Sequence, residues 1–168
     1  DINLIVTSDH GMTDISPERV VNINDYVKPE WCEVIDGRTP TSIFSKPEYR
    51  DSICNALKKA AHIHVWKKEE IPAELHYGSS DRIGDIVVAP ELGWQFTDVA
   101  RDTKGDHGYF PQSPDMQVMF RAIGPDFKRG YISGGFVNVD IYPLLSHLLQ
   151  IVPEKTDGQF ERIKEILR

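Results

Sequence analysis

The sequence predicts a mixed α/β protein with a mainly parallel central sheet, and three observations support this fold class. Leu4, Ile5 and Val6 form an uninterrupted apolar run, as in a strand that is buried on both faces of a parallel sheet. An amphipathic helix is expected from Pro47, with extended apolar stretches before and after it. The chain has 168 residues, which is long enough for a domain with a hydrophobic core. We therefore expect helices packed against a sheet.

The first part of the chain is expected to form short strands. Residues 20–27 read as an extended stretch with polar alternation. Residues 33–35 and 41–44 look like two strands on either side of Asp36-Gly37-Arg38. Because an Asp-Gly pair favours positive φ, these two strands are predicted to form a hairpin.

A helix and a further strand follow the hairpin. Apolar residues recur every three to four positions over 47–61, which predicts a helix with a proline in its first turn. Residues 63–66 then read as a strand. Strand, helix and strand in this order predict a small βαβ-like unit, and we interpret residues 36–90 as an insertion or lid beside the main sheet.

The second half of the chain alternates apolar segments with a long loop. Residues 93–96 open a loop that continues through Pro114, where charge, glycine and proline replace any apolar periodicity. The remaining elements are expected to be two strands, at 85–89 and 116–123, and two helices, at 142–149 and 160–167.

The composition excludes some classes of function. Hydrophobic residues make up 40% and charged residues 27% of the chain, as in ordinary globular proteins. The net charge of −7 argues against a general nucleic-acid-binding surface, which is usually basic. No apolar stretch approaches the roughly 20 residues that span a bilayer. Cys32 and Cys54 are too few for a disulfide framework or a four-cysteine zinc site, and the sequence leaves open whether they pair or are both free.

Two residue types that bind metals follow the first apolar run directly. Adjacent residues on a strand point to opposite faces, so Asp9 and His10 can hold one metal only where the strand has ended and the chain turns. Gly11 permits such a turn. Ligands of open α/β sheets bind at the carboxyl ends of the strands, and a carboxylate beside an imidazole suits zinc. The alternative is that Asp9 caps a turn and His10 is an ordinary surface residue.

A second histidine lies between glycines in the long loop, in the sequence Gly105-Asp106-His107-Gly108-Tyr109. A bound metal at His107 would fix this loop in place.

His62 and His64 are spaced to share one face of a strand. We reject them as a metal pair because no third ligand is spaced nearby.

These features together resemble the nucleotide pyrophosphatase/phosphodiesterase family, the type I phosphodiesterases of the alkaline phosphatase superfamily. The likeness extends in the family's order through further segments at 66–72, 82–86, 93–94, 116–127 and 138–145. The resemblance implies an alkaline-phosphatase-like α/β fold that is truncated on its N-terminal side. The 168 residues are then the C-terminal part of a single catalytic domain.

The resemblance also implies a site with two Zn²⁺ ions, six acidic or histidine ligands, and a threonine or serine nucleophile. Asp9 and His10 match ligands of the metal that also holds the nucleophile, and His107 matches a ligand of the other metal. The remaining ligands and the nucleophile precede this stretch in the family. Thr7 and Ser8 are interpreted as strand-end residues that hydrogen-bond the turn.

One position departs from the family's pattern. Phe110 stands two residues after the histidine–glycine pair at the place where the family usually has an aspartate. Loss of a carboxylate that supports His107 would weaken metal binding, unless Asp106 supplies it from the other side. Tyr109 is a candidate for lining the substrate pocket, with packing against the core as the alternative.

The activity implied is zinc-dependent hydrolysis of a small-molecule phosphodiester or of a nucleotide pyrophosphate bond, in an exported protein. The isolated 168 residues are expected to be inactive without the N-terminal half that supplies the nucleophile. Two alternatives remain. The first is another enzyme of the superfamily, such as a phosphoglycerate mutase or phosphonate hydrolase. The second is a non-catalytic binding module.

Overall fold

The computed structural model describes residues 2–168. The chain divides into two compact units, and each is considered by itself. The first unit combines the residues up to Asp9 with Val118–Arg168, and the second unit is His10–Gln117. Within the described residues, no helix is both long and apolar enough to cross a membrane.

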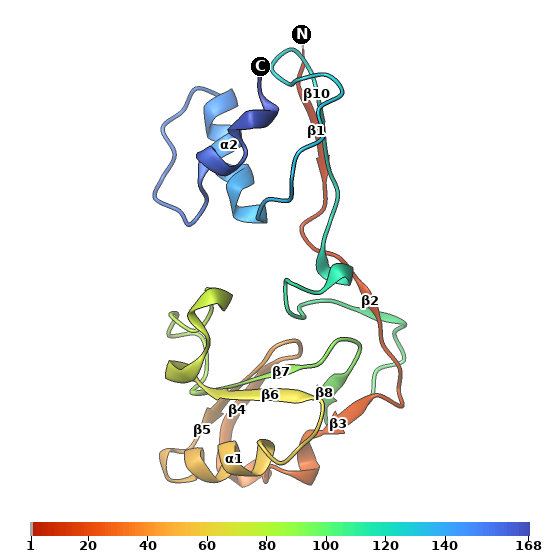
Figure 1. Ribbon diagram of the computed structural model, residues 1–168. Helices are drawn as coiled ribbons and strands as arrows, with labels where there is room; N and C mark the ends of the chain where they lie inside the picture. The colour runs from red at the N-terminus through yellow and green to blue at the C-terminus, as the bar shows by residue number, and fades with distance from the viewer. Residues whose placement is uncertain (1) are drawn as a thin grey trace. The chain divides into compact units, whose positions relative to one another are not determined.

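A four-stranded antiparallel sheet dominates the second unit (Figure 1). Its strands lie in the order β4-β5-β7-β6, with bounds β4 Cys32–Gly37, β5 Thr41–Ser45, β6 Ile63–Lys67 and β7 Ile86–Pro90. The hairpin predicted around Asp36-Gly37-Arg38 is confirmed, because β4 and β5 pair antiparallel and Gly37 has a φ of +77°. The Asp-Gly signal therefore located the turn correctly.

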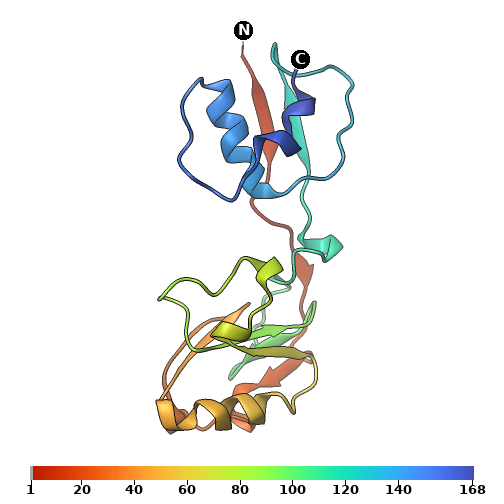
Figure 2. The same ribbon diagram turned by 60° about the vertical axis from the view of Figure 1, so that its left-hand side comes forward.

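The helix α1, Arg50–Leu57, lies along one face of this sheet (Figures 1 and 2). A 3₁₀ turn, Pro47–Tyr49, leads into it. Strands β5 and β6 each pair antiparallel with β7, so they run parallel to each other with β7 between them. The predicted βαβ-like unit is therefore present in its split form. Its core contains apolar side chains from α1 and the sheet, including Ile43, Ile53, Leu57, Val65, Ile86 and Val88.

Two short pairings complete the second unit. Strands β2, Thr13–Asp14, and β9, Gly105–Asp106, pair antiparallel, whereas β3, Val20–Asn22, and β8, Gln95–Thr97, pair parallel. The extended stretch predicted for 20–27 is too long, because the side chain of Asn22 accepts a hydrogen bond from the Asn24 N–H and starts a 3₁₀ turn. Strand β8 lies where the sequence predicted a loop. It pairs with β3, whose residues are far away in the sequence, and local periodicity cannot predict such a pairing.

The first unit contains β1, Leu4–Thr7, β10, Phe120–Ile123, and α2, Ile141–Leu148. Strands β1 and β10 pair antiparallel. One face of this pair packs on a cluster built around Phe127, Leu144, Ile163 and Ile166, joined by Ile5, Phe120 and Ala122. The strand predicted for 116–123 is thus shorter than expected, and the helix predicted for 142–149 is confirmed.

The mixed α/β class is confirmed, but the strand directions differ from the prediction. Leu4 and Val6 are 56% and 43% exposed on the other face of β1, so this strand is not buried on both faces in the described residues. Its pairing with β10 is antiparallel. An apolar run reports burial and carries no information on the direction of the neighbouring strand, which the chain connection decides.

The C-terminal segment forms two 3₁₀ turns, Phe160–Arg162 and Lys164–Ile166, where the sequence predicted one amphipathic helix. Side chains three residues apart lie on one side of a 3₁₀ helix, so a spacing of three residues is satisfied by either geometry. Ile163 and Ile166, which have that spacing, are 0% and 7% exposed. Of the residues predicted to form the apolar face, Ile163 is buried and Phe160 and Leu167 pack against the same cluster, whereas Ile166 was not predicted to belong to this face and the helix type was wrong.

Candidate metal centre

The imidazole rings of His10 and His107 stack face to face within the second unit. Their centroids are 3.7 Å apart and the ring planes differ by 13°. A glycine follows each histidine, and both glycines are required by close approaches of other backbone segments. A Cβ on Gly11 would collide with the carbonyl of Asp115, and one on Gly108 with the carbonyl of Thr39. The two histidines predicted from the sequence are thus brought together by backbone packing that only glycine permits.

The ring of His10 is oriented by its own backbone. Its Nδ1 lies 2.9 Å from the carbonyl oxygen of Gly11. A carbonyl oxygen only accepts hydrogen bonds, so Nδ1 carries the proton and, in the neutral ring, Nε2 keeps its lone pair. A hydrogen bond from one ring nitrogen to a backbone carbonyl is the usual support for a metal-binding histidine.

A buried polar network fixes the backbone around His107. The carboxylate of Asp106, which is 8% exposed, pairs with Arg101 and accepts a hydrogen bond of 3.1 Å from the Thr39 hydroxyl. The side-chain oxygen of Gln95, which is 1% exposed, accepts from the backbone N–H and the Nε of Arg101. Gln95, Arg101 and Thr39 were not identified from the sequence, because no residue pattern distinguishes a buried polar side chain in a loop from a solvated one.

The charge on Asp106 is stabilised by this network. Burial raises the pKa of its carboxyl group, but hydrogen bonds from Arg101, from the backbone of His107 and from Thr39 outweigh burial and hold the pKa below its usual value. Asp106 therefore supports the backbone N–H of His107 and the guanidinium of Arg101. The sequence made Asp106 a candidate to support the His107 ring in place of the aspartate missing at Phe110. The carboxylate instead binds the backbone of His107.

Tyr109 is buried at 6% exposure, and its hydroxyl donates a hydrogen bond of 2.8 Å to the carbonyl of Trp94. Burial, together with the charge of Asp106, raises its pKa to about 12. This favours the packing interpretation of Tyr109 over a role in lining a substrate pocket.

Phe110 packs edge-on against two rings of β6. Its centroid is 5.0 Å from His64 and 6.2 Å from Trp66, with interplanar angles of 88° and 85°. Phe110 therefore holds the His107 loop against the sheet by aromatic packing.

Asp9 lies in the first unit, two residues after the end of β1. Its backbone carbonyl accepts a hydrogen bond of 3.0 Å from the side chain of Asn138. The hydroxyl of Thr7, at the end of β1, donates to the carbonyl of Met119 at 3.0 Å and so bonds to the residue before β10. Among residues 2–168, no group of three or more His, Cys, Asp or Glu side chains is arranged to hold a metal ion.

The remaining histidines and cysteines have structural surroundings. His62 stacks on Trp94 at 3.7 Å and lies 2.9 Å from a carboxylate oxygen of Glu91. Strand β6 begins at Ile63, and His62 precedes it with a φ of +65°. His62 therefore does not share a strand face with His64, contrary to the prediction from the sequence. Cys32 and Cys54 are both free thiols.

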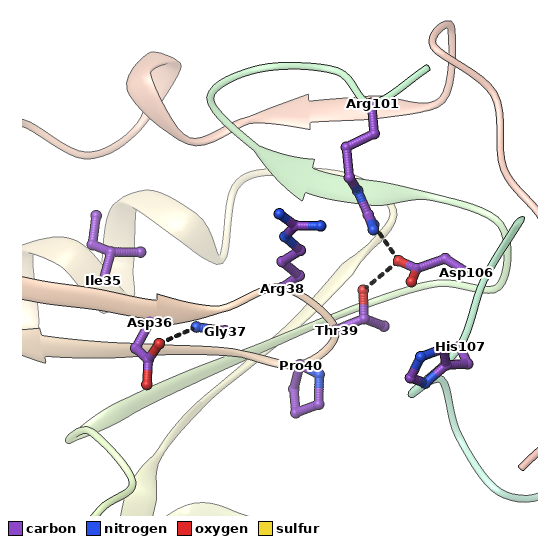
Figure 3. A pocket seen from close by; sticks show the side chains of 9 residues that line it. All are labelled: Ile35, Asp36, Gly37, Arg38, Thr39, Pro40, Arg101, Asp106 and His107. Atoms are coloured by element: carbon purple, nitrogen blue, oxygen red, sulfur yellow. Dashed lines mark hydrogen bonds and ion pairs between the residues drawn. The ribbon is translucent and has the colours of Figure 1, made fainter. Parts of the chain in front are cut away.

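A pocket of about 750 Å³ opens beside His107 in the second unit (Figure 3). The β4–β5 hairpin forms one side, and Arg101, Asp106 and His107 form the other. Arg38 and Thr39, at the hairpin tip, line it as well.

A sequence profile of the type I phosphodiesterase/nucleotide pyrophosphatase family matches residues 1–110, a stretch that contains Asp9, His10 and His107. The chain belongs to this family. It is 37% identical over 168 residues to the bovine bis(5′-adenosyl)-triphosphatase ENPP4. It is 34% identical over 169 residues to the human ectonucleotide pyrophosphatase/phosphodiesterase family member 5. These alignments cover 99% of the chain but 37% and 35% of the relatives' lengths.

Solved structures of this family share the fold. The human ectonucleotide pyrophosphatase/phosphodiesterase 5 matches with a TM-score of 0.92 at 34% identity, over 99% of this chain and 45% of that chain. A murine form of the same protein, an inactive threonine-to-alanine variant in complex with AMP, matches with a TM-score of 0.91 at 35% identity. The family and the fold class predicted from the sequence are thus confirmed.

Proposed function

We propose that this chain forms part of a zinc-dependent hydrolase of phosphodiester or nucleotide pyrophosphate bonds. The observation that carries the proposal is the family match over residues 1–110, which includes all three candidate ligands. The stacked rings of His10 and His107 are the structural support for it.

The residues present suit zinc by their chemistry. Asp9, His10 and His107 offer one carboxylate and two imidazoles, which are donors that zinc prefers. The hydrogen-bonded Nδ1 of His10 leaves Nε2 as the ring nitrogen suited to a metal. We assign Asp9 and His10 to the metal beside the nucleophile and His107 to the other metal.

Zinc at such a site would supply positive charge to the phosphate and acidify a bound hydroxyl or water. The chain's own residues hold the ligands in position: Gly11 and Gly108 bring the two histidines together, and Asp106 fixes the backbone of His107. The nucleophile is proposed to be a threonine or serine outside these 168 residues. A murine relative that is inactive as a threonine-to-alanine variant supports a threonine.

The substrate class is proposed to be small nucleotide diesters and pyrophosphates. The bovine relative is named a bis(5′-adenosyl)-triphosphatase, and the murine structure contains AMP. The net charge of −7 opposes the approach of an anionic substrate, so local positive charge has to attract it.

The proposal is tested in the natural full-length protein by its zinc content and its hydrolysis of bis(4-nitrophenyl) phosphate. We expect His107→Ala to lower both, whereas His76→Ala, at an exposed histidine of the same unit, should change neither. A His107→Ala protein with the zinc content and the rate of the unchanged protein would overturn the assignment.

A further inference from the structure

The pocket beside His107 contains two arginines that differ in their partners. The guanidinium of Arg101 pairs with the carboxylate of Asp106, which compensates its charge. Arg38 lines the same pocket from the tip of the β4–β5 hairpin and is exposed. Among residues 2–168, no carboxylate forms an ion pair with Arg38. Asp36 and Asp106 line the pocket as well, so its two arginines and two aspartates balance in formal charge, but within the described residues Arg38 differs from Arg101 in having no carboxylate as an ion-pair partner.

The acidic residue of the hairpin that also lines the pocket, Asp36, uses its carboxylate within the turn. Asp36 accepts a hydrogen bond of 2.8 Å from the backbone N–H of Gly37. Figure 3 shows Arg38 extending from the hairpin toward the side of Arg101, while Asp36 points to the other side. An anion in the pocket would supply the charge partner that Arg38 lacks, whereas Arg101 already has one in Asp106.

The chemistry of Arg38 suits a phosphate. The hydroxyl proton of Thr39 is already donated to Asp106, so among the polar side chains at the hairpin tip Arg38 is the donor available to an anion. A guanidinium presents several N–H donors in one plane, and these match phosphate oxygens in a bidentate arrangement. His107, a proposed metal ligand, lines the cavity too, so an anion held here lies on the side of the proposed metal centre.

We infer that this pocket binds the phosphate of the leaving group, with Arg38 as the anchoring residue. The inference rests on the proposed function and extends it. A pocket of this kind favours substrates whose leaving group carries its own phosphate, such as nucleoside polyphosphate diesters. Diesters that release a neutral or aromatic alcohol gain nothing from it. Arg38 thereby acts as a specificity-determining residue outside the candidate ligand set.

The inference is tested with two substrates that differ in their leaving groups. In the natural full-length protein, kcat/KM is compared for diadenosine triphosphate, which releases ADP, and for thymidine 5′-(4-nitrophenyl) phosphate, which releases nitrophenolate. We expect Arg38→Ala to lower the ratio of the first value to the second by about tenfold or more, as for loss of a hydrogen bond to a charged group. Arg38→Lys should lower it less, since the charge remains but the planar fork is lost.

Arg82→Ala is the matched control, because Arg82 is an exposed arginine of the same unit that does not line the pocket. It removes the same charge and should leave the ratio as it is. An equal fall of the ratio in Arg38→Ala and Arg82→Ala, or no fall in either, would overturn the inference.

A binding measurement separates this inference from the proposed function. If the unchanged protein hydrolyses neither substrate, the proposed function fails, and calorimetric titration with ADP still decides the role of the pocket. An ADP dissociation constant about tenfold higher in Arg38→Ala than in Arg82→Ala supports it, and equal constants overturn it. Inorganic phosphate that binds the unchanged protein as tightly as ADP would also overturn it, because the pocket would then take a free anion.

Discussion

The centroids of the imidazole rings of His10 and His107 lie 3.7 Å apart, although His10 is the first residue of the second unit and His107 lies near the end of its sequence. The hydrogen bond from Nδ1 of His10 to the Gly11 carbonyl defines the tautomer of that ring. We predict that neutral His10 is protonated at Nδ1 and unprotonated at Nε2. Long-range ¹H–¹⁵N NMR spectra measure this directly, with His10→Gln to assign the signals. A protonated Nε2 beside an unprotonated Nδ1 would contradict the proposed ligand atom.

The 168 residues by themselves are predicted to have little or no hydrolytic activity. They contain three of the six ligands that the family resemblance implies, and no residue in them matches the nucleophile. The measurement is the rate of bis(4-nitrophenyl) phosphate hydrolysis by the isolated chain with added zinc. Measurable hydrolysis that His107→Ala abolishes would show that the chain holds a complete site, and the prediction would be wrong.

The ion pair between Arg101 and Asp106 is expected to contribute strongly to the stability of the second unit. Their side chains are 19% and 11% exposed, so removing one partner leaves a largely buried charge unpaired. We expect Asp106→Ala to lower the free energy of unfolding by about 3–5 kcal/mol in urea titrations. Replacing both residues, as in Arg101→Met with Asp106→Leu, should cost less than Asp106→Ala alone.

The control for this prediction is the exposed pair Lys164–Glu161, whose side chains are 49% and 72% exposed. Glu161→Ala should change the unfolding midpoint little, because exposed ion pairs contribute little to stability. A larger loss in the double variant than in Asp106→Ala would mean that Arg101 and Asp106 act through contacts other than their mutual pairing.

Elements defined by nearby residues were predicted well from the sequence. The hairpin at Gly37 follows from the conformational freedom of an Asp-Gly turn, and α1 follows from apolar residues at helical spacing. The strand before Asp9 was located correctly. In each case the signal lies within a few residues, which is the range over which backbone preference and side-chain periodicity act.

Long-range pairing was not predictable in the same way. The pairing of β3 with β8, and the antiparallel partner of β1, depend on chain connections that leave no local pattern. The buried amide of Gln95 looks like any loop residue in the sequence. Asp140 directly precedes α2, yet its carboxylate forms no side-chain capping bond to this helix and accepts a hydrogen bond of 2.7 Å from the Gln159 N–H. Polar residues find their partners only when distant segments meet.

The edge contact between Phe110 and Trp66 is predicted to stabilise the His107 loop. A double-mutant cycle with Phe110→Leu and Trp66→Leu should give a coupling energy of about 0.5–1.5 kcal/mol, as for aromatic pairs in this geometry. The measurement is the free energy of unfolding of the four proteins. Trp31, which stacks on Tyr49 at 5.7 Å, provides the control cycle with Phe110 and should show no coupling. Equal coupling in both cycles would mean that Phe110 acts through general loosening of the fold.

Cys32 is predicted to react slowly with iodoacetamide at neutral pH. Burial, together with the negative charge of Asp85, raises the pKa of its thiol above the ordinary value, and Lys46 opposes this shift. The reactive species is the thiolate, so a raised pKa reduces the reactive fraction at neutral pH. Lys46→Gln should slow alkylation further, because it removes the charge that favours the thiolate. The measurement is the alkylation rate at Cys32 by mass spectrometry, with the unfolded chain as the reference for an unshifted thiol. Faster alkylation in the folded protein than in the unfolded chain would contradict the prediction.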